Sequence, residues 1–250
     1  ASIHLTFDYA SEQDFKKKFR IANSLTSVMG ALFDNTPFFE GRLNPTNCRR
    51  IAIWSNCDNA RCGVVPKVLD QDFGYAEYAT YLLSKPVIFL MEGEKFRYTR
   101  EQPLKEVFDP KKIPLAELEH VLTMVFPDVR VKKYLEIRMT DAVPYPLNFS
   151  VIALWKSILY NDENLAKLEK MLSTINNQDI VESKKECIAK GLKATLAGQK
   201  VLDVARDIVA LAEEGLESGE KSYLLPLQSL VLQGKSPAQL TKEKLYLGKQ

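Results

Sequence analysis

The stretch "RVKKYLEIRMTDAVPY", from Arg130 to Tyr145, decides how the first part of this 250-residue chain is interpreted. Read as one strand, it sends alternate side chains to opposite faces of a sheet. Its apolar face carries Val131, Leu135, Ile137 and Met139, with Lys133 as the exception. Its other face carries Arg130, Lys132, Tyr134, Glu136, Arg138 and Thr140. The apolar face predicts a place in the core, and the polar face raises the question of what its charges bind.

The first nine residues, "ASIHLTFDY", have the same pattern. One face of this segment carries Ile3, Leu5 and Phe7, and the other carries Ser2, His4, Thr6 and Asp8. If both segments lie in one sheet, their apolar faces pack against helices and their polar faces share one surface. We therefore expect a charged surface built from His4, Asp8, Arg130, Lys132, Glu136 and Arg138.

Between these two segments the chain predicts helices, a hairpin and a long irregular stretch. "SEQD" is a capping box, with Ser11 as N-cap and Asp14 at N3, and it begins a predicted helix over residues 12–33. Residues 34–72 show no long period because glycine and proline interrupt them. Further predicted elements are helices over 74–83 and 114–126 and a hairpin over 85–99 that turns at Glu92–Gly93.

After residue 146 the pattern is almost purely helical. It predicts helices over 147–160, 162–174, 180–191 and 200–217, and one more short helix in the tail. Too few strands alternate with helices for a doubly wound sheet, so the sequence favours an α+β fold with an antiparallel sheet packed by helices. We expect residues 1–146 to hold the sheet and residues 147–250 a helical region that packs on it as one structural unit.

Composition narrows the class of protein. Hydrophobic residues make up 46% of the chain and charged residues 26%, which is typical of a globular protein. The net charge of +2 gives no reason to expect a nucleic-acid partner, and no apolar run reaches the ~20 residues of a membrane helix. The spacing of the four cysteines matches no zinc module, which leaves free thiols or a disulfide open. We expect free thiols and a cytoplasmic location. Ala1 already lies in a strand pattern, so we expect a longer protein.

The charged surface has two readings from its residue types alone. Alternating charges can form an ordinary solvated sheet face, and Glu136 with Arg138 can form a structural ion pair. Alternatively, arginines on either side of a carboxylate suit the binding of phosphate or carboxylate groups. Glutamate and histidine together suit a divalent cation, and the mixture fits phosphoryl transfer. The chain has no Walker loop, so a nucleotide would have to be held by this sheet face.

Several segments resemble, in order, the carboxy-terminal part of glutamate–cysteine ligase of the plant and bacterial kind. They are "ASIHLTFDYASEQDFKKKFRIANSL", "RRIAIWSNCDNARCG", "DFGYAEYATYLLSKPVIFL", "FPDVRVKKYLEIRMTDAVPY" and "LWKSILYND". The resemblance implies a glutamine-synthetase-like catalytic fold with a curved antiparallel sheet. It implies a ligase that joins glutamate to cysteine through a γ-glutamyl phosphate, the first step of glutathione synthesis, with ATP as co-substrate and Mg²⁺ as cofactor.

The resemblance also assigns roles to individual residues. Glu136 aligns with a metal ligand, and His4 faces the metal and the nucleotide. Arg138 aligns with the catalytic arginine that meets substrate oxygens, and Arg50 with an arginine that clamps the glutamate carboxylate. Tyr145 replaces a tryptophan of the substrate site. Arg130 and Lys132 are expected to support nucleotide binding, as supporting charges more than as direct ligands.

Departures from the family pattern keep other functions open. Thr6 stands where asparagine is usual, and Met139–Thr140 where Gly-Ala is usual, which indicates a divergent member with an altered substrate preference. The alternatives are a carboxylate–amine ligase with another amine acceptor and a non-catalytic module that binds an acidic ligand. Because the family's amino-terminal half is missing from this chain, we expect it to be a partner, and we expect little activity from this chain alone.

Overall fold

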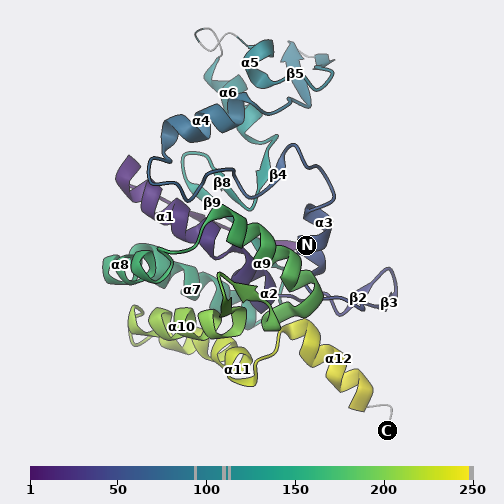
Figure 1. The fold of residues 1–250 in the computed structure, drawn as a ribbon, viewed down its shortest axis with the longest axis vertical. Helices are drawn as coiled ribbons and strands as arrows, with labels where there is room; N and C mark the ends of the chain where they lie inside the picture. Colours follow the sequence, from purple (N-terminus) through teal and green to yellow (C-terminus); the bar gives the residue numbers. More distant parts are fainter. Residues whose placement is uncertain (93–94, 109–110, 112–113, 248–250) are drawn as a thin grey trace.

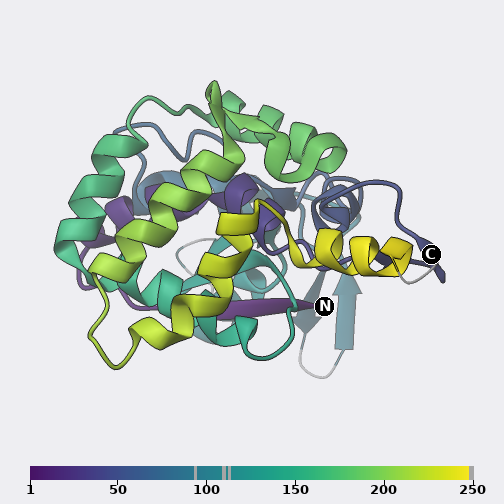
Figure 2. The ribbon, with the colours of Figure 1, turned by 90° about the horizontal axis from the view of Figure 1, so that it is seen from below.

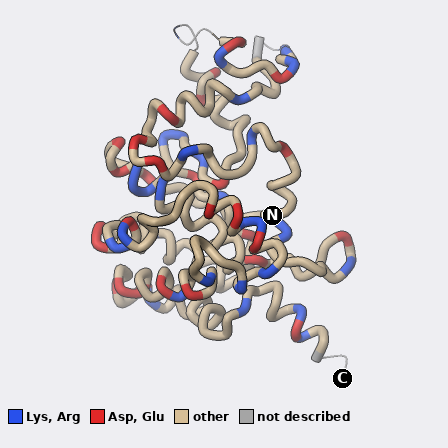
Figure 3. The backbone as a smooth tube through the Cα atoms, in the orientation of Figure 1, with Lys and Arg blue, Asp and Glu red and all other residues tan. Residues whose placement is uncertain are grey.

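A computed structural model of the chain describes residues 1–92, 95–108, 111 and 114–247, without the side chains of residues 91, 92 and 247. It has an α+β fold, as predicted, with helices around a three-stranded antiparallel sheet in the order β1–β9–β8 (Figure 1). Basic and acidic residues are interspersed along the chain (Figure 3), in keeping with the net charge of +2. Within the described residues, no helix has the length and apolar character needed to cross a membrane.

The central sheet contains β1 (Ser2–Phe7), β8 (Val129–Val131) and β9 (Leu135–Asp141). The prediction of a single strand over residues 130–140 is wrong, because residues 132–134 form the turn of a hairpin. Most of the predicted faces survive this correction, since residues opposite one another in an antiparallel pair lie on the same face. The exceptions are Lys132 and Tyr134, which lie in the turn, and the start of β1, where the register shifts between Ile3 and Leu5 and Ile3 lies opposite Thr140. Arg130 and Thr6 are both opposite Glu136, so all three lie on the polar face.

Helices cover the apolar face of this sheet. Leu135 is 0% and Ile137 is 1% exposed, and both belong to one large core with α1 (Glu12–Ser24), α2 (Thr26–Leu32) and α7 (Leu147–Tyr160). The predicted helix over 12–33 is therefore present but broken at Leu25. Ser11 is its N-cap, as predicted, and its hydroxyl accepts the N–H of Asp14 at 3.2 Å.

The second half of the chain is helical, as predicted. It contains α8 (Asp162–Met171), α9 (Asn177–Lys190), α10 (Val201–Glu214), α11 (Leu225–Gln233) and α12 (Pro237–Leu247). The predictions missed α11 and the small pair of β10 (Thr195–Leu196) and β11 (Gln199–Lys200). Helix α12 projects from one side of the molecule (Figure 2). The large core runs across residue 146, and the boundary there stays a prediction.

The described residues between 85 and 124 form one end of the molecule (Figure 1) around a separate small apolar cluster. This end contains β5 (Phe89–Glu92), β6 (Lys95–Tyr98), α5 (Leu104–Val107) and α6 (Leu115–Leu122). Helix α4 (Tyr75–Leu83) leads to it, and its Tyr78 and Leu82 pack in the large core. Strands β5 and β6 confirm the predicted hairpin, whose turn lies partly outside the described residues. Helix α6 ends earlier than predicted, because β7 (Phe126–Pro127) pairs with β4 (Cys62–Gly63).

The irregular stretch over residues 34–72 is held in place by short elements and side-chain contacts. It contains β2 (Phe38–Phe39), β3 (Arg42–Leu43) and α3 (Arg49–Trp54). Asp58 accepts the N–H of Arg61 at 3.2 Å, and Arg61 Nε donates to the carbonyl of Pro86 at 2.8 Å. These contacts hold the stretch in which α3 lies over the polar face of the sheet.

All four cysteines of the chain are free.

The apolar face of β9 should carry much of the stability of the fold. Ile137→Ala should lower the free energy of unfolding by about 2–5 kcal/mol, because it leaves a cavity in a packed core. Urea denaturation followed by circular dichroism measures this change. The control is Ile53→Ala, at a residue that is 47% exposed, which should change stability by at most about 0.5 kcal/mol. Equal losses in the two variants would contradict this description of the core.

Candidate functional site

The polar face is buried where β8 and β9 form it, whereas His4 and Thr6 of β1 are exposed. Arg130, Glu136 and Arg138 are 8%, 9% and 7% exposed, so the reading as an ordinary solvated face is wrong. Helix α3 and the segment that follows α6 lie against this face: Arg50 of α3 bonds to β9, and Arg130 bonds to the carbonyls of Thr123 and Val125. Buried charges require partners or ligands, because removal from water is costly.

Glu136 is the centre of the buried cluster. Its Oε2 atom accepts a hydrogen bond from Arg130 Nε at 2.6 Å and lies 3.5 Å from Arg138 Nη1. Burial acts to raise the pKa of Glu136, but the hydrogen bond and charge of Arg130, with the charges of Arg138 and Lys132, outweigh burial and lower that pKa. Glu136 of β9 is therefore an ionised carboxylate, and the hydrogen bond from Arg130 ties it to β8.

The two arginines beside Glu136 have different surroundings. Arg130 donates to Glu136 and, through Nη1, to the carbonyls of Thr123 at 3.1 Å and Val125 at 3.2 Å, so its bonds hold the protein together. Among the described contacts, the guanidinium of Arg138 has one side-chain hydrogen bond, the long one to Glu136 at 3.5 Å, and it also lies over the rings of Trp54 and Phe126. Burial and the charge of Arg130 lower the pKa of Arg138, although Glu136 acts in the opposite direction. Arg138 is thus the incompletely neutralised cation of the cluster.

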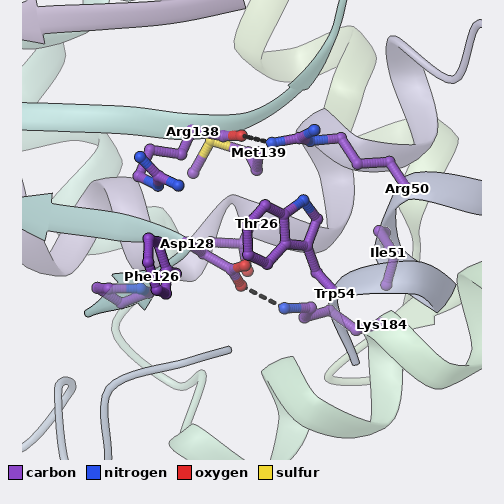
Figure 4. A pocket seen from close by; sticks show the side chains of 10 residues that line it. Thr26, Arg50, Ile51, Trp54, Phe126, Asp128, Arg138, Met139 and Lys184 are labelled. Atoms are coloured by element: carbon purple, nitrogen blue, oxygen red, sulfur yellow. Dashed lines mark hydrogen bonds and ion pairs between the residues drawn. The ribbon is translucent and has the colours of Figure 1, made fainter. Parts of the chain in front are cut away.

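Arg50 approaches the same place from α3. Its Nη2 atom donates to the backbone carbonyl of Arg138 at 2.9 Å (Figure 4). The guanidinium carbons of Arg50 and Arg138 lie 5.6 and 5.9 Å from the ring centroid of Trp54, so both contact one indole. Burial lowers the pKa of Arg50, opposed by the more distant charges of Asp141 and Asp128. Two arginines from distant parts of the chain therefore face one another across Trp54.

A small cavity of about 20 Å³ lies between these residues, with room for about one water molecule or one ligand oxygen. Its floor also includes an ion pair between Lys184 of α9 and Asp128. Its lining residues are Thr26, Arg50, Ile51, Trp54, Phe126, Pro127, Asp128, Arg138, Met139 and Lys184 (Figure 4). The arrangement suits an anionic oxygen, which arginine binds through charge-assisted hydrogen bonds.

Sequence reasoning missed most of this cavity. Trp54 is not among the expected site residues, yet it is half-buried and forms a wall of the cavity. Its spacing of four residues from Arg50 in α3 is a signal that the two share a helix face. Asp128 and Lys184 are 56 residues apart and carry no pattern that pairs them.

His4 lies at the more exposed side of Glu136. Its Nδ1 atom is 3.5 Å from Glu136 Oε1, and its side chain is 37% exposed. Burial and the charge of Arg138 lower the pKa of His4, although Glu136 raises it, so the imidazole stays neutral near pH 7. Neutral imidazole and ionised carboxylate are the forms that ligate metals. In the part of the chain that the structure describes, no cluster of three or more His, Cys, Asp or Glu side chains could hold a metal ion.

The remaining predicted residues lie at the edges. Lys132 is in the turn between β8 and β9 and lines a separate hollow of about 510 Å³ with Tyr9, Tyr134 and residues of α6. Asp8 is exposed at the end of β1, and no hydrogen bond or ion pair joins its carboxylate to Glu136 among the described contacts. Tyr145 is 80% exposed, packs against Phe149 and is absent from the cavity lining. Its role in substrate binding stays a prediction without support from this geometry.

Comparisons with known proteins agree on one family. The family model described as Glutamate-cysteine ligase family 2 (GCS2) matches residues 1–245. The chain is 33% identical over 258 residues to the chloroplastic glutamate–cysteine ligase of Nicotiana tabacum, covering 99% of this chain and 49% of that protein. It is 31% identical over 248 residues to glutamate–cysteine ligase B, chloroplastic, of Oryza sativa subsp. japonica, covering 95% and 50%. The chain thus spans about half the length of the curated relatives it matches.

The ionised state of Glu136 should make stability depend on pH. The pKa of Glu136 in the folded protein lies below its ordinary value of 4.5. The contribution of the ionised carboxylate to the free energy of unfolding is therefore complete above pH 4.5 and is lost as pH falls through the lowered pKa. Urea denaturation should therefore show Glu136→Gln to be less stable than the parent at pH 7, with a difference that shrinks below about pH 4.5. The exposed Glu106 offers a control, and Glu106→Gln should change little. A difference that does not vary between pH 7 and pH 3 would argue against the charged cluster.

Proposed function

The chain belongs to glutamate-cysteine ligase family 2, and from this premise we propose that it is the carboxy-terminal part of an ATP- and Mg²⁺-dependent glutamate–cysteine ligase. The product would be γ-glutamylcysteine, formed through a γ-glutamyl phosphate in the first step of glutathione synthesis. The observation that carries this proposal is that the buried guanidinium of Arg138 and the half-buried guanidinium of Arg50 lie at one small cavity. Glu136 is already hydrogen-bonded to Arg130. Arg50 and Arg138 can therefore both receive the carboxylate of a substrate.

The proposed reaction has two steps. A γ-carboxylate oxygen of glutamate attacks the γ-phosphorus of ATP, and ADP leaves. The amine of cysteine then attacks the acyl carbon, loses a proton and expels inorganic phosphate. Negative charge passes between carboxylate, phosphoryl and ADP oxygens, so the main task of the protein is positioning and charge neutralisation. Arg50 would hold the glutamate carboxylate, and Arg138 would act as the catalytic arginine that contacts the reacting oxygens.

Nucleotide and metal would approach from the side of His4 and Lys132. The hollow of about 510 Å³ beside Lys132 has the size of a small-molecule site, with apolar residues of α6 and two tyrosines in its wall. At this place in the described structure, Glu136 Oε1 and His4 Nδ1 could be offered to Mg²⁺ as ligand atoms. Mg²⁺ prefers oxygen ligands and usually shares them with substrate phosphates, where it neutralises negative charge. Arg130 would act mainly by fixing Glu136.

Other parts of the proposal concern the whole enzyme. A glutamine-synthetase-like catalytic fold with a curved sheet would be completed by an amino-terminal half, since this chain spans half of its relatives. The four free cysteines support a reducing compartment such as the cytoplasm. Met139 lines the cavity and stands where glycine is usual in the family. This difference supports the second candidate, a carboxylate–amine ligase with a different amine acceptor. A non-catalytic module that binds an acidic ligand would show binding without turnover in the complete protein.

Titration calorimetry with L-glutamate and with Mg-ATP, together with assays of amine-dependent ADP release, tests this function. The chain alone should bind glutamate with little turnover, and the full-length protein should release ADP faster with cysteine than with other amines. Arg138→Ala should weaken glutamate binding by roughly tenfold or more, because a charge-assisted hydrogen bond is lost. Arg42→Ala, at an exposed arginine of β3, should leave it unchanged. If Arg138→Ala binds glutamate and Mg-ATP as well as the parent, the arginine assignment is wrong.

Lys132 should contribute to nucleotide binding and not to glutamate binding. Lys132→Ala should raise the dissociation constant for Mg-ATP about threefold to tenfold, because a surface lysine contributes modestly to phosphate binding. Lys200→Ala, at an exposed lysine of β11, is the matched control. Fluorescence titration with a nucleotide analogue measures both. If the dissociation constant for Mg-ATP is the same in Lys132→Ala as in the parent, the hollow at α6 is not the nucleotide site.

A further inference from the structure

Helix α7 is apolar on nearly every side, yet one stripe of it faces solvent. Its buried residues pack in the large core, with α8, α10 and α11 around the helix. The exposed stripe consists of Phe149, Ile152, Lys156 and Tyr160, which follow one another at helical spacing. Its three apolar members are between 41% and 50% exposed. Because a helix that is apolar on all sides is normally buried, the stripe indicates a surface that further protein covers.

Strand β1 runs along the same helix. At its start, the carbonyl of Ala1 accepts the N–H of Ala142, in the loop that leads to α7, at 3.3 Å. At its end, the N–H of Asp8 donates to the hydroxyl of Tyr160 at 3.0 Å, and the rings of Phe7 and Tyr160 lie 5.5 Å apart. A strand of 6 residues and a helix of 14 residues are both about 20 Å long. Through Tyr160, the stripe on α7 is therefore continuous with β1.

The outer edge of β1 is open. In the part of the sheet that the structure describes, β1 pairs with β9 on one side and with no strand on the other. Unpaired backbone groups of an edge strand are a template for a further strand, and lysine or proline commonly protects such edges. The sequence of β1, SIHLTF, contains neither residue. The edge is thus suited to pairing with another segment.

The uncovered part of the polar face lies at the same strand. Helix α3 and the segment after α6 bond to β9 and β8, whereas His4 and Thr6 of β1 remain exposed. This gap in the cover is where further protein groups can approach His4 and the Oε1 atom of Glu136. Three independent features, the apolar stripe, the open edge and the uncovered polar face, therefore meet at β1.

We propose that the open edge of β1 and the apolar stripe of α7 together form the docking surface for the amino-terminal half of the protein. A strand of that half adds to β1, and its apolar side chains cover Phe149, Ile152 and Tyr160. The length of the relatives favours this occupant, because the chain spans about half of each and leaves a segment as long as itself to be placed. The inference rests on the proposed function in taking the chain as the carboxy-terminal part of a ligase.

Hydrogen exchange followed by mass spectrometry tests the docking surface, with this chain alone and the full-length protein as the two samples. The slowest-exchanging amides of residues 2–7 should exchange at least roughly tenfold more slowly in the full-length protein, because pairing with a further strand suppresses local opening. The amides of β10 and β11, which lie in a small hairpin of their own, should exchange at similar rates in both samples.

Two variants test the apolar stripe. Ile152→Lys places a charge in it, and Leu232→Lys, at an 83% exposed residue of α11, is the matched control. Both should melt within about 2 °C of the parent in this chain alone, because both positions are open to solvent. In the full-length protein, Ile152→Lys should speed the exchange of residues 2–7 at least roughly fivefold, since a buried lysine weakens the docking. Leu232→Lys should not change it.

The outcomes separate this inference from the proposed function. Equal exchange of residues 2–7 in both samples, or equal effects of Ile152→Lys and Leu232→Lys, overturns the docking surface and leaves the ligase proposal intact. A chain that sediments alone as a dimer, and as a monomer after Ile152→Lys, identifies a second copy as the occupant and also overturns it. If the full-length protein releases no ADP with any amine but protects β1 as expected, the ligase proposal fails and the docking surface stands.

Discussion

The buried carboxylate of Glu136 is the constraint on which the site depends. It lies in the middle of β9, hydrogen-bonded by Arg130 of β8 and approached by His4 of β1, so one side chain ties together all three strands of the sheet. Buried ion pairs contribute little net stability compared with apolar residues, but the loss of one partner leaves an uncompensated charge. Glu136 therefore fixes the arrangement of the cations around it, and the geometry of the cavity follows from that arrangement.

Within this arrangement the arginines have separate tasks. Arg130 has its hydrogen bonds to the protein satisfied by Glu136 and two carbonyls, which makes it a structural cation. Arg138 is buried and Arg50 is half-buried, neither is fully neutralised, and each lies near the face of Trp54. Charge that is buried and not fully neutralised is available to a ligand, because the cost of desolvation has been met during folding.

Much of the fold and part of the site follow from sequence alone. The period of two in β9 and the pairing with β8 correctly grouped Arg130, Glu136 and Arg138. His4 joins them at 3.5 Å from Glu136, although the register of β1 shifts between Ile3 and Leu5. That grouping survived the error over the strand, because the hairpin turn preserves which residues share a face. Helical periodicity and the cap at Ser11 located the main helices, since both depend on residues close together in the chain.

Tertiary structure decided everything that depends on distant residues. The burial of the polar face along β8 and β9, the break of the first helix at Leu25, and the cavity between Trp54 and the Lys184–Asp128 pair have no periodic signature. Local patterns specify the direction of a side chain relative to its own element, but not which other element covers it. Whether a charged sheet face meets water or a second layer of protein is set by the packing of α3 and of the segment after α6 against it, and packing is a property of the whole chain.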